Sequence, residues 1–290
     1  MSISSELGER RSVDLPQGTV AYRERGEGPA IVFVHGLLVN GDHWRKVVPL
    51  LADRYRCVAP DLPLGAHEQP LRAGADMSAS GVARLIADFI AALDLRDVTI
   101  VSNDTGDALA QVLVTEHPER IGRLVLTAGD AFTNFLPWMI KPMRGLGFAP
   151  PLMKLLARGG RVRAVQKAAL VGVVQKMPPA DVLDGYSRPP YESAEVRRDL
   201  QMFLRHASPR ATLAAAKKLP ELRIPALIVW TKASSPLFPK AHGKRLAKLI
   251  PDARYEEVAD SRAFIPEDQP ERLAELIGGF VPAEVRAAAA

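Results

Sequence analysis

The chain has 290 residues, of which 47% are hydrophobic and 24% charged, an ordinary balance for a folded domain that buries its core without disulfides. Its formal charge of +5 comes from 38 basic and 33 acidic residues, with one denser basic stretch from Lys154 through Lys176. No aromatic or recognition element accompanies that stretch, so the composition argues against a nucleic-acid partner.

The single cysteine and the lack of a signal peptide or membrane-spanning segment predict a cytoplasmic protein. We expect neither a metal nor a cofactor. The single cysteine, Cys57, excludes an intrachain disulfide and a cysteine metal cluster, and it fits a reducing compartment. Residues 1–11 are polar and lack a signal-peptide core, and no apolar run approaches the roughly 20 residues that span a bilayer. We therefore expect no membrane partner, and a monomer or homodimer.

The chain before residue 132 alternates strand-like and helix-like segments, which predicts βαβ units and a mostly parallel sheet. The predicted strands are 30–34, 56–60, 98–101 and 123–127, and the predicted helices are 43–55, 78–95 and 105–117. From about residue 132 to 219 the alternation stops, and the chain becomes helical, proline-punctuated and locally basic. This segment is expected to be an inserted helical cap.

Alternation resumes near residue 225. A strand at 225–230, a helix at 242–250, a strand at 254–258 and a helix at 270–280 are predicted in turn. The tail, Ala287 to Ala290, is expected to fray. The prediction is an α/β core of residues 1–131 and 220–290, with a cap at 132–219.

The segment from Ser102 to Gly106 carries the main chemical signal. A strand that ends in Ser-Asn-Asp-Thr-Gly and opens a helix has the layout of a nucleophile elbow, which projects one side chain over the carboxyl edge of the sheet. The helix N-terminus would keep the Asp104 carboxylate ionised, so that it could attack carbon and form an ester. The alternative is that Asp104 merely caps the helix.

A second motif favours the catalytic interpretation. Val34-His35-Gly36-Leu37 follows a predicted strand upstream, where the oxyanion-hole loop belongs in this layout. The backbone N–H groups of Leu37 and Thr105 are the expected oxyanion-hole donors. His35 is expected to shape the loop beside the substrate.

Five segments together resemble the α/β-hydrolase superfamily. They are Phe33 to Gly36, Ala59 to Leu62, Ser102 to Gly106, Leu124 to Thr127 and Phe264 to Pro270. The aspartate at the elbow is similar to the haloalkane dehalogenase and epoxide hydrolase branches. The resemblance implies an α/β-hydrolase fold, and an aspartyl ester that a histidine-activated water then hydrolyses.

Enzymes of this family combine the nucleophile with a histidine and a second acid in a catalytic triad. In this chain the histidine and the acid depart from that pattern. The residue that aligns with the family's histidine is Ala263, and the stretch 230–236 lacks the usual acid. Asp130 occupies the position from which some dehalogenases supply the acid, although a turn aspartate is an equal alternative. His67 is the best remaining base, although a loop histidine is usually only solvated. His43, His117, His206 and His242 are expected at the surface or in packing.

The groups specific to each branch are missing as well. Thr105 replaces the halide-binding tryptophan of dehalogenases, Leu37 replaces their asparagine, and residues 37–40 lack the proline of epoxide hydrolases. In the cap, Tyr186 and Tyr191 could donate a proton to an opening epoxide, and Trp138 could line the pocket. Such cap aromatics more often serve packing.

Three functions remain open from the sequence. The first is a hydrolase of a small apolar substrate that uses Asp104 as nucleophile or general base. The second is a non-hydrolytic lyase, isomerase or cyclase that keeps the pocket and the oxyanion hole without the histidine. The third is a catalytically inactive binding protein.

Overall fold

The computed structural model describes residues 5–233 and 235–283, so the tail at 287–290 lies outside it. Within these residues, eight strands form one sheet in the order β1-β2-β4-β3-β5-β6-β7-β8. The strands are β1 (Glu9–Leu15), β2 (Gly18–Arg25), β3 (Ala30–Val34), β4 (Arg56–Pro60), β5 (Val98–Asp104), β6 (Ile121–Gly129), β7 (Ala226–Thr231) and β8 (Ala253–Val258). β1, β2 and β4 pair antiparallel, and all other pairs are parallel.

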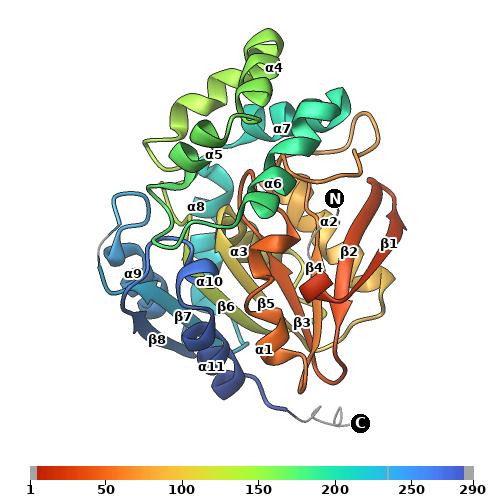
Figure 1. Cartoon of the computed structure of the whole chain (residues 1–290). Helices are drawn as coiled ribbons and strands as arrows, with labels where there is room; N and C mark the ends of the chain where they lie inside the picture. The colour runs from red at the N-terminus through yellow and green to blue at the C-terminus, as the bar shows by residue number, and fades with distance from the viewer. Residues whose placement is uncertain (1–4, 234, 284–290) are drawn as a thin grey trace.

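Two helical layers cover the sheet. α1 (Val48–Leu51) packs against α11 (Pro270–Phe280) on one face, and α2 (Ala79–Ala92) packs against α3 (Thr105–Glu116) on the other (Figure 1). α9 (Lys240–Leu249) lies beside β7 and β8, and the short α10 (Ile265–Asp268) precedes α11. The strand pairing confirms the predicted mostly parallel α/β sheet. The sequence indicated it because the central strands are continuous apolar runs that are buried on both faces.

The sequence pattern misses the first two strands and mispredicts one helix. It predicted no strand before residue 30, where the structure forms β1 and the largely buried β2. β1 is an exposed edge strand with charged residues and no apolar alternation. It also predicted one helix over 43–55, where the chain forms the 3₁₀ turn η2 (Gly41–Trp44) and only one turn of α1. Pro49 lacks an amide hydrogen and stands in the first turn of α1, a position that marks a helix start.

The insertion forms a helical layer at one end of the sheet. It comprises η3 (Lys141–Phe148), α4 (Pro150–Gly159), α5 (Arg163–Leu170), α6 (Ala180–Glu192), α7 (Ala194–His206), α8 (Pro209–Lys218) and η4 (Leu219–Glu221). α4 to α7 stand above the sheet, whereas α8 packs against α3 (Figure 1). No helix among the described residues has both the length and the hydropathy needed to cross a membrane.

Polar contacts fasten this layer to the core. Asp268 of α10 accepts hydrogen bonds from the amides of Gln175 and Lys176 at 2.8 Å through one carboxylate oxygen. Its other oxygen accepts from the amide of Arg262 at 2.9 Å. The Phe264 amide donates to the carbonyl of Val173 at 2.9 Å. The segment before α6 is therefore fixed to the loop that follows β8.

Candidate active site

Asp104 lies at a strained turn between β5 and α3. Its φ of 59° and ψ of −130° place a non-glycine residue in a disfavoured region, and α3 begins at the next residue. Two glycines allow the turn to pack closely. A Cβ on Gly106 would lie 2.4 Å from the carbonyl oxygen of Val34, and one on Gly36 would lie 2.3 Å from Asp104 Oδ1. The local geometry is that of a nucleophile elbow.

The carboxyl group of Asp104 is buried but well supplied with donors. The amide of Leu37 donates to Asp104 Oδ1 at 3.1 Å, and the amide and hydroxyl of Thr105 also hydrogen-bond to the carboxyl. Burial raises the pKa of this carboxyl, and the three hydrogen bonds oppose that effect without cancelling it. The Leu37 amide therefore holds Oδ1, and the Thr105 amide and hydroxyl are further donors to the carboxyl group.

Two further buried carboxyl groups adjoin Asp104. Asp130 Oδ2 accepts from the hydroxyl of Thr105 at 3.2 Å, and Asp107 Oδ1 accepts from the hydroxyl of Ser102 at 2.6 Å. Burial and the nearby Asp104 charge raise both pKa values well above the usual range. Asp107 was not singled out from the sequence, where it looks like an ordinary first-turn helical acid. Within residues 5–233 and 235–283, no group of three His, Cys, Asp or Glu side chains is arranged to hold a metal ion.

The loop after β8 is tightly packed around Ala263. This residue is fully buried, and its carbonyl accepts a hydrogen bond from Asn103 Nδ2 at 3.0 Å. The ring of His43 lies close by, with Nε2 2.8 Å from Asn103 Oδ1 and its centroid 4.5 Å from that of Phe264. Burial lowers the pKa of His43 to about 3, so the ring is neutral. The predicted packing role of His43 fits these contacts.

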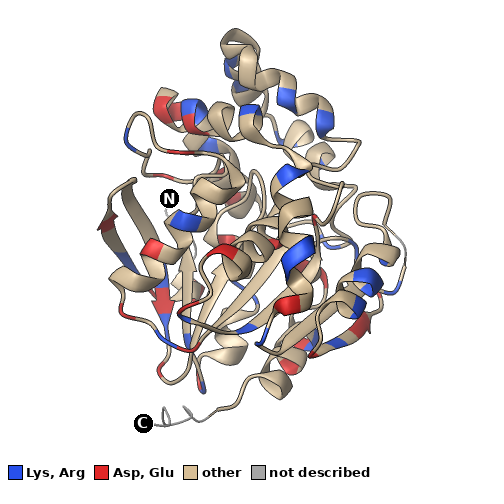
Figure 2. Ribbon diagram, turned by 180° about the vertical axis from the view of Figure 1, so that it is seen from behind, with Lys and Arg blue, Asp and Glu red and all other residues tan. Residues whose placement is uncertain are grey.

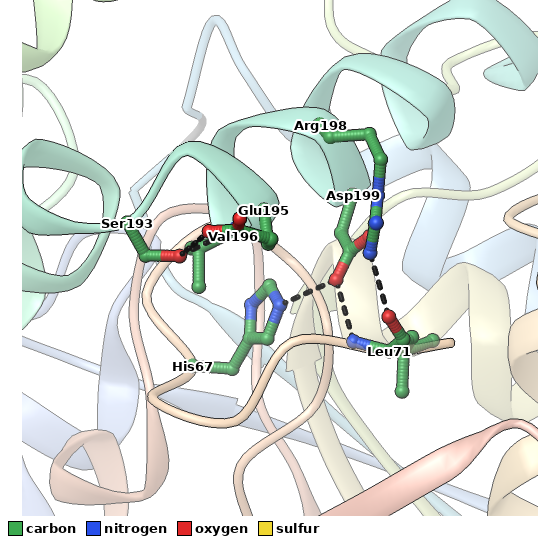
Figure 3. Close-up of polar contacts among 7 residues, drawn as sticks. All are labelled: His67, Leu71, Ser193, Glu195, Val196, Arg198 and Asp199. Atoms are coloured by element: carbon green, nitrogen blue, oxygen red, sulfur yellow. Dashed lines mark hydrogen bonds and ion pairs between the residues drawn. The ribbon is translucent and has the colours of Figure 1, made fainter. Parts of the chain in front are cut away.

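His67 is directed towards the cap rather than hydrogen-bonded to Asp104. Its Nε2 lies 3.3 Å from Asp199 Oδ2 on α7, and the same oxygen accepts from the amide of Leu71 at 2.7 Å (Figure 3). Burial raises the pKa of Asp199, but hydrogen bonds from His67, Leu71 and Arg198 outweigh it and place that pKa below the usual value. His67 and Asp199 are 132 residues apart in sequence, which explains why local sequence patterns did not reveal their contact. His67 therefore contacts α7, and no hydrogen bond joins it to Asp104 among the described residues.

The other predicted site residues are spread over different environments. His35 is buried with both ring nitrogens engaged, since Nδ1 donates to the carbonyl of Gly36 and Nε2 accepts from the amide of Leu62 at 2.9 Å. Burial lowers its pKa to about 4, so it is a neutral loop-shaping residue. Tyr186 is buried on α6, which lies over the loop after β3.

Trp138 and Tyr191 do not have buried, pocket-lining positions. The side chain of Trp138 is 68% exposed, and Tyr191 is 41% exposed with the guanidinium carbon of Arg161 4.7 Å from its ring centre. The predicted lining role of Trp138 does not fit its exposure. The sequence marks both residues as aromatic but does not specify which side of a cap helix faces the core.

Asp61 offers a test of the electrostatics around the site. It accepts from the amide of Gly41 at 3.0 Å, and burial raises its pKa to about 7. A raised pKa means that the stability contributed by the protonated form is complete below pH 3.8 and is lost as the pH rises through 7. Asp61→Asn should therefore flatten the fall in unfolding free energy between about pH 4 and pH 7, and should stabilise the protein by about 2–4 kcal/mol at pH 8. Denaturant unfolding across this range measures it, and parallel profiles for variant and wild type would contradict it.

Comparisons with known proteins agree with this architecture. The family model described as "Alpha/beta hydrolase family" matches residues 31–276. Haloalkane dehalogenase 2 of Mycobacterium tuberculosis (strain ATCC 25618 / H37Rv) is 28% identical over 282 residues, covering 93% of this chain and 93% of that protein. The uncharacterized hydrolase YugF of Bacillus subtilis (strain 168) is 24% identical over 269 residues, covering 91% of this chain and 95% of that protein.

Solved structures share the fold. An alpha/beta hydrolase fold protein from Burkholderia ambifaria superposes with a TM-score of 0.80 at 22% identity, covering 94% of this chain and 97% of that one. Haloalkane dehalogenase DbeA from Bradyrhizobium elkani USDA94 gives a TM-score of 0.75 at 22% identity, covering 94% and 96%. At this level of identity the likeness establishes the fold alone.

Proposed function

Because the chain belongs to the alpha/beta hydrolase family, we propose that it is a hydrolase of a small apolar substrate in which Asp104 is the nucleophile. One observation carries the proposal: Asp104 occupies the strained elbow with the amide of Leu37 on its Oδ1. The haloalkane dehalogenase relative supports an alkyl halide as the substrate class, with epoxides as the related alternative.

The first half-reaction uses Oδ2 of Asp104, the oxygen that does not accept from the Leu37 amide. Oδ2 attacks the carbon that bears the halogen, the carbon–halogen bond breaks, and the halide leaves with the bonding electrons. An alkyl ester of Asp104 results. Burial removes water from around the nucleophile, which strengthens the electrostatic interactions within the site.

The second half-reaction consumes one water. Water attacks Cγ of the ester and gives a proton to a base, while the charge that develops on Oδ1 is stabilised by the amides of Leu37 and Thr105. Release of the alcohol then restores the carboxylate. No imidazole stands at Ala263, and Asp130 approaches the site through the Thr105 hydroxyl with its own pKa raised. We therefore infer that this step is slow.

Replacement of the nucleophile tests the proposal. Asp104→Asn should lower the release of halide or diol from a panel of haloalkanes and epoxides by at least about 10³-fold. Exposed Asp53 supplies the matched control, and Asp53→Asn should leave the rate unchanged. Since the nucleophile must be ionised and its pKa is raised, the wild-type rate should increase with pH above 3.8. An equal rate in Asp104→Asn and wild type would remove Asp104 from the chemistry.

A second function is favoured by the missing imidazole. An ionised aspartate beside two oxyanion donors can take a proton from carbon without forming an ester, which would make the protein a lyase, isomerase or cyclase. Conversion of a substrate without incorporation of oxygen from labelled water would select this function. If neither an enzymatic conversion nor an adduct can be found while ligands still bind, the chain is an inactive binding protein.

A further inference from the structure

The cap carries an unusual concentration of exposed apolar side chains. Of the thirteen large hydrophobic residues that are exposed in the described part of the chain, nine lie between Trp138 and Val171. Phe148 is 71% exposed, Leu155 61% and Val162 54%. Single exposed hydrophobic residues are ordinary, whereas apolar residues gathered on one surface mark an interaction site, so the helices that carry these residues are the place to look for one.

α5 is oriented with its polar side inward. Its buried residue is Gln166, whose amide donates to Asp184 and Ser187 of α6 at 3.1 and 2.8 Å. Val162 and Val165, three residues apart at the start of the helix, are exposed instead. The apolar side chains at the start of α5 are therefore not covered by the rest of the described chain.

α4 presents a second apolar row. Leu152, Leu155 and Leu156 have i, i+3 and i+4 spacing, and their side chains are 48%, 61% and 49% exposed, while Met153 is buried. We call Leu152, Leu155, Leu156, Val162 and Val165 the cap outer face. α4 lies at the end of the molecule that is farthest from the sheet (Figure 1). The exposed fractions show that the rest of the described chain leaves these side chains uncovered.

The segment that carries the cap outer face is rich in basic residues. Residues 131–180 contain eight lysine and arginine residues and no aspartate or glutamate, although the whole chain has a charge of only +5. The helices at the top of Figure 2 show the blue of these basic residues. Lys154, Arg158 and Lys167 are exposed and form no ion pair within the part of the chain that the structure describes.

We propose that the cap outer face docks on the surface of an anionic phospholipid bilayer. Exposed leucine and valine side chains would enter the boundary between headgroups and acyl chains, while the surrounding lysine and arginine side chains attract the lipid phosphates. The sequence-based expectation of no membrane partner rested on the lack of a spanning segment and a signal peptide, and surface docking requires neither.

Two other occupants fit the surface less well. A symmetric pair of copies would bring the same positively charged face against itself, because a two-fold interface uses one patch twice. A nucleic acid would satisfy the charge, but it would leave aliphatic side chains without an apolar partner. A lipid surface satisfies both the charge and the apolar area, and the proposal does not depend on the chemistry at Asp104.

Co-sedimentation with vesicles tests the proposal on the full-length chain. The protein should bind phosphatidylcholine vesicles that contain about one-third phosphatidylglycerol, bind pure phosphatidylcholine vesicles weakly, and be released by high salt. The double variant Leu152→Ser/Leu155→Ser should lose at least about tenfold in partitioning, since two large side chains no longer enter the boundary. Leu50→Ser is the matched control, because Leu50 on α1 is also 48% exposed.

The charge requirement is tested in the same assay. Lys154→Gln/Arg158→Gln should weaken binding roughly fivefold for each charge removed. Lys217→Gln/Lys218→Gln, at exposed positions of α8, should have no effect. Thermal unfolding confirms that each variant is folded.

Tryptophan fluorescence gives an independent measurement. Of the three tryptophans, Trp44 and Trp230 are fully buried and only Trp138 is exposed, so a blue shift on addition of anionic vesicles would report on the cap. Trp138→Phe should abolish the shift. No vesicle binding, or equal loss in Leu50→Ser, would overturn the proposal. So would a wild-type dimer that the Leu152→Ser/Leu155→Ser variant converts to monomer, or tighter binding to duplex DNA than to the anionic vesicles.

Discussion

Wild-type protein incubated with a reactive alkyl halide should accumulate a covalent ester on Asp104, detectable as a mass increase on the peptide that contains it. Displacement of the halide needs only the ionised carboxylate, whereas hydrolysis of the ester needs a base, whose contribution is worth about 10²- to 10⁴-fold. The residue in the position of the family's histidine is Ala263, so the second step lacks that base. Ala263→His should shorten the lifetime of the ester within that range.

The tight packing around Ala263 means that Ala263→His needs a control variant of similar volume. Ala263 is fully buried, so a larger side chain must displace neighbours at a cost of about 1–3 kcal/mol. Ala263→Gln adds similar volume without a base and should leave the ester long-lived, while thermal unfolding reports the strain in both variants. Rapid wild-type turnover with no adduct would show that another base exists. Unchanged adduct lifetime in a folded Ala263→His variant would show that its imidazole does not reach the ester.

Removal of the Glu267 carboxylate should destabilise the protein by about 3–5 kcal/mol, because it leaves Arg45 charged, buried and unpaired. Arg45 Nη2 lies 2.7 Å from Glu267 Oε2, and the two side chains are 7% and 2% exposed. Lys46 adds a second contact at 2.6 Å from Oε1. The pair joins the turn after β3 to α10, so its loss also loosens the loop that contains Ala263.

Denaturant unfolding of Glu267→Ala measures this effect. Glu256→Ala is the matched control, since Glu256 pairs with Arg254 at the same 2.7 Å but the two side chains are 26% and 54% exposed. A surface pair of this kind contributes about 0–1 kcal/mol. Equal losses of unfolding free energy in the two variants would mean that Arg45 reaches water when Glu267 is removed. Burial would then not determine how much the ion pair contributes to stability.

Local patterns predicted the central sheet and the elbow. β3, β4 and β5 are short apolar runs bounded by turn residues, and such runs form buried parallel strands in almost any α/β context. Asp104 was found for the same reason, since the strand, the turn and the helix that shape it are consecutive in the chain. The edge strand β1 has no such pattern, because its residues face water and are not constrained by a core.

Contacts between distant segments were decided by tertiary structure. His67 could be selected as a loop histidine, but only the placement of α7 brings Asp199 to its ring. Likewise, Arg45 and Glu267 are 222 residues apart, and neither segment alone indicates a buried pair. Electrostatic shifts such as the raised pKa values of Asp107 and Asp130 also follow from burial and from the charge of Asp104, which only the folded chain defines.

The cap shows the limit of periodicity. The sequence predicted a helical insertion at 132–219, and the structure forms helices between Lys141 and Glu221. Which side is buried was decided by the neighbours of each helix, so that α5 turns Gln166 to α6 and leaves Val162 and Val165 exposed. Helical spacing places residues on a common face, but the direction of that face depends on which other segments are available to pack against it.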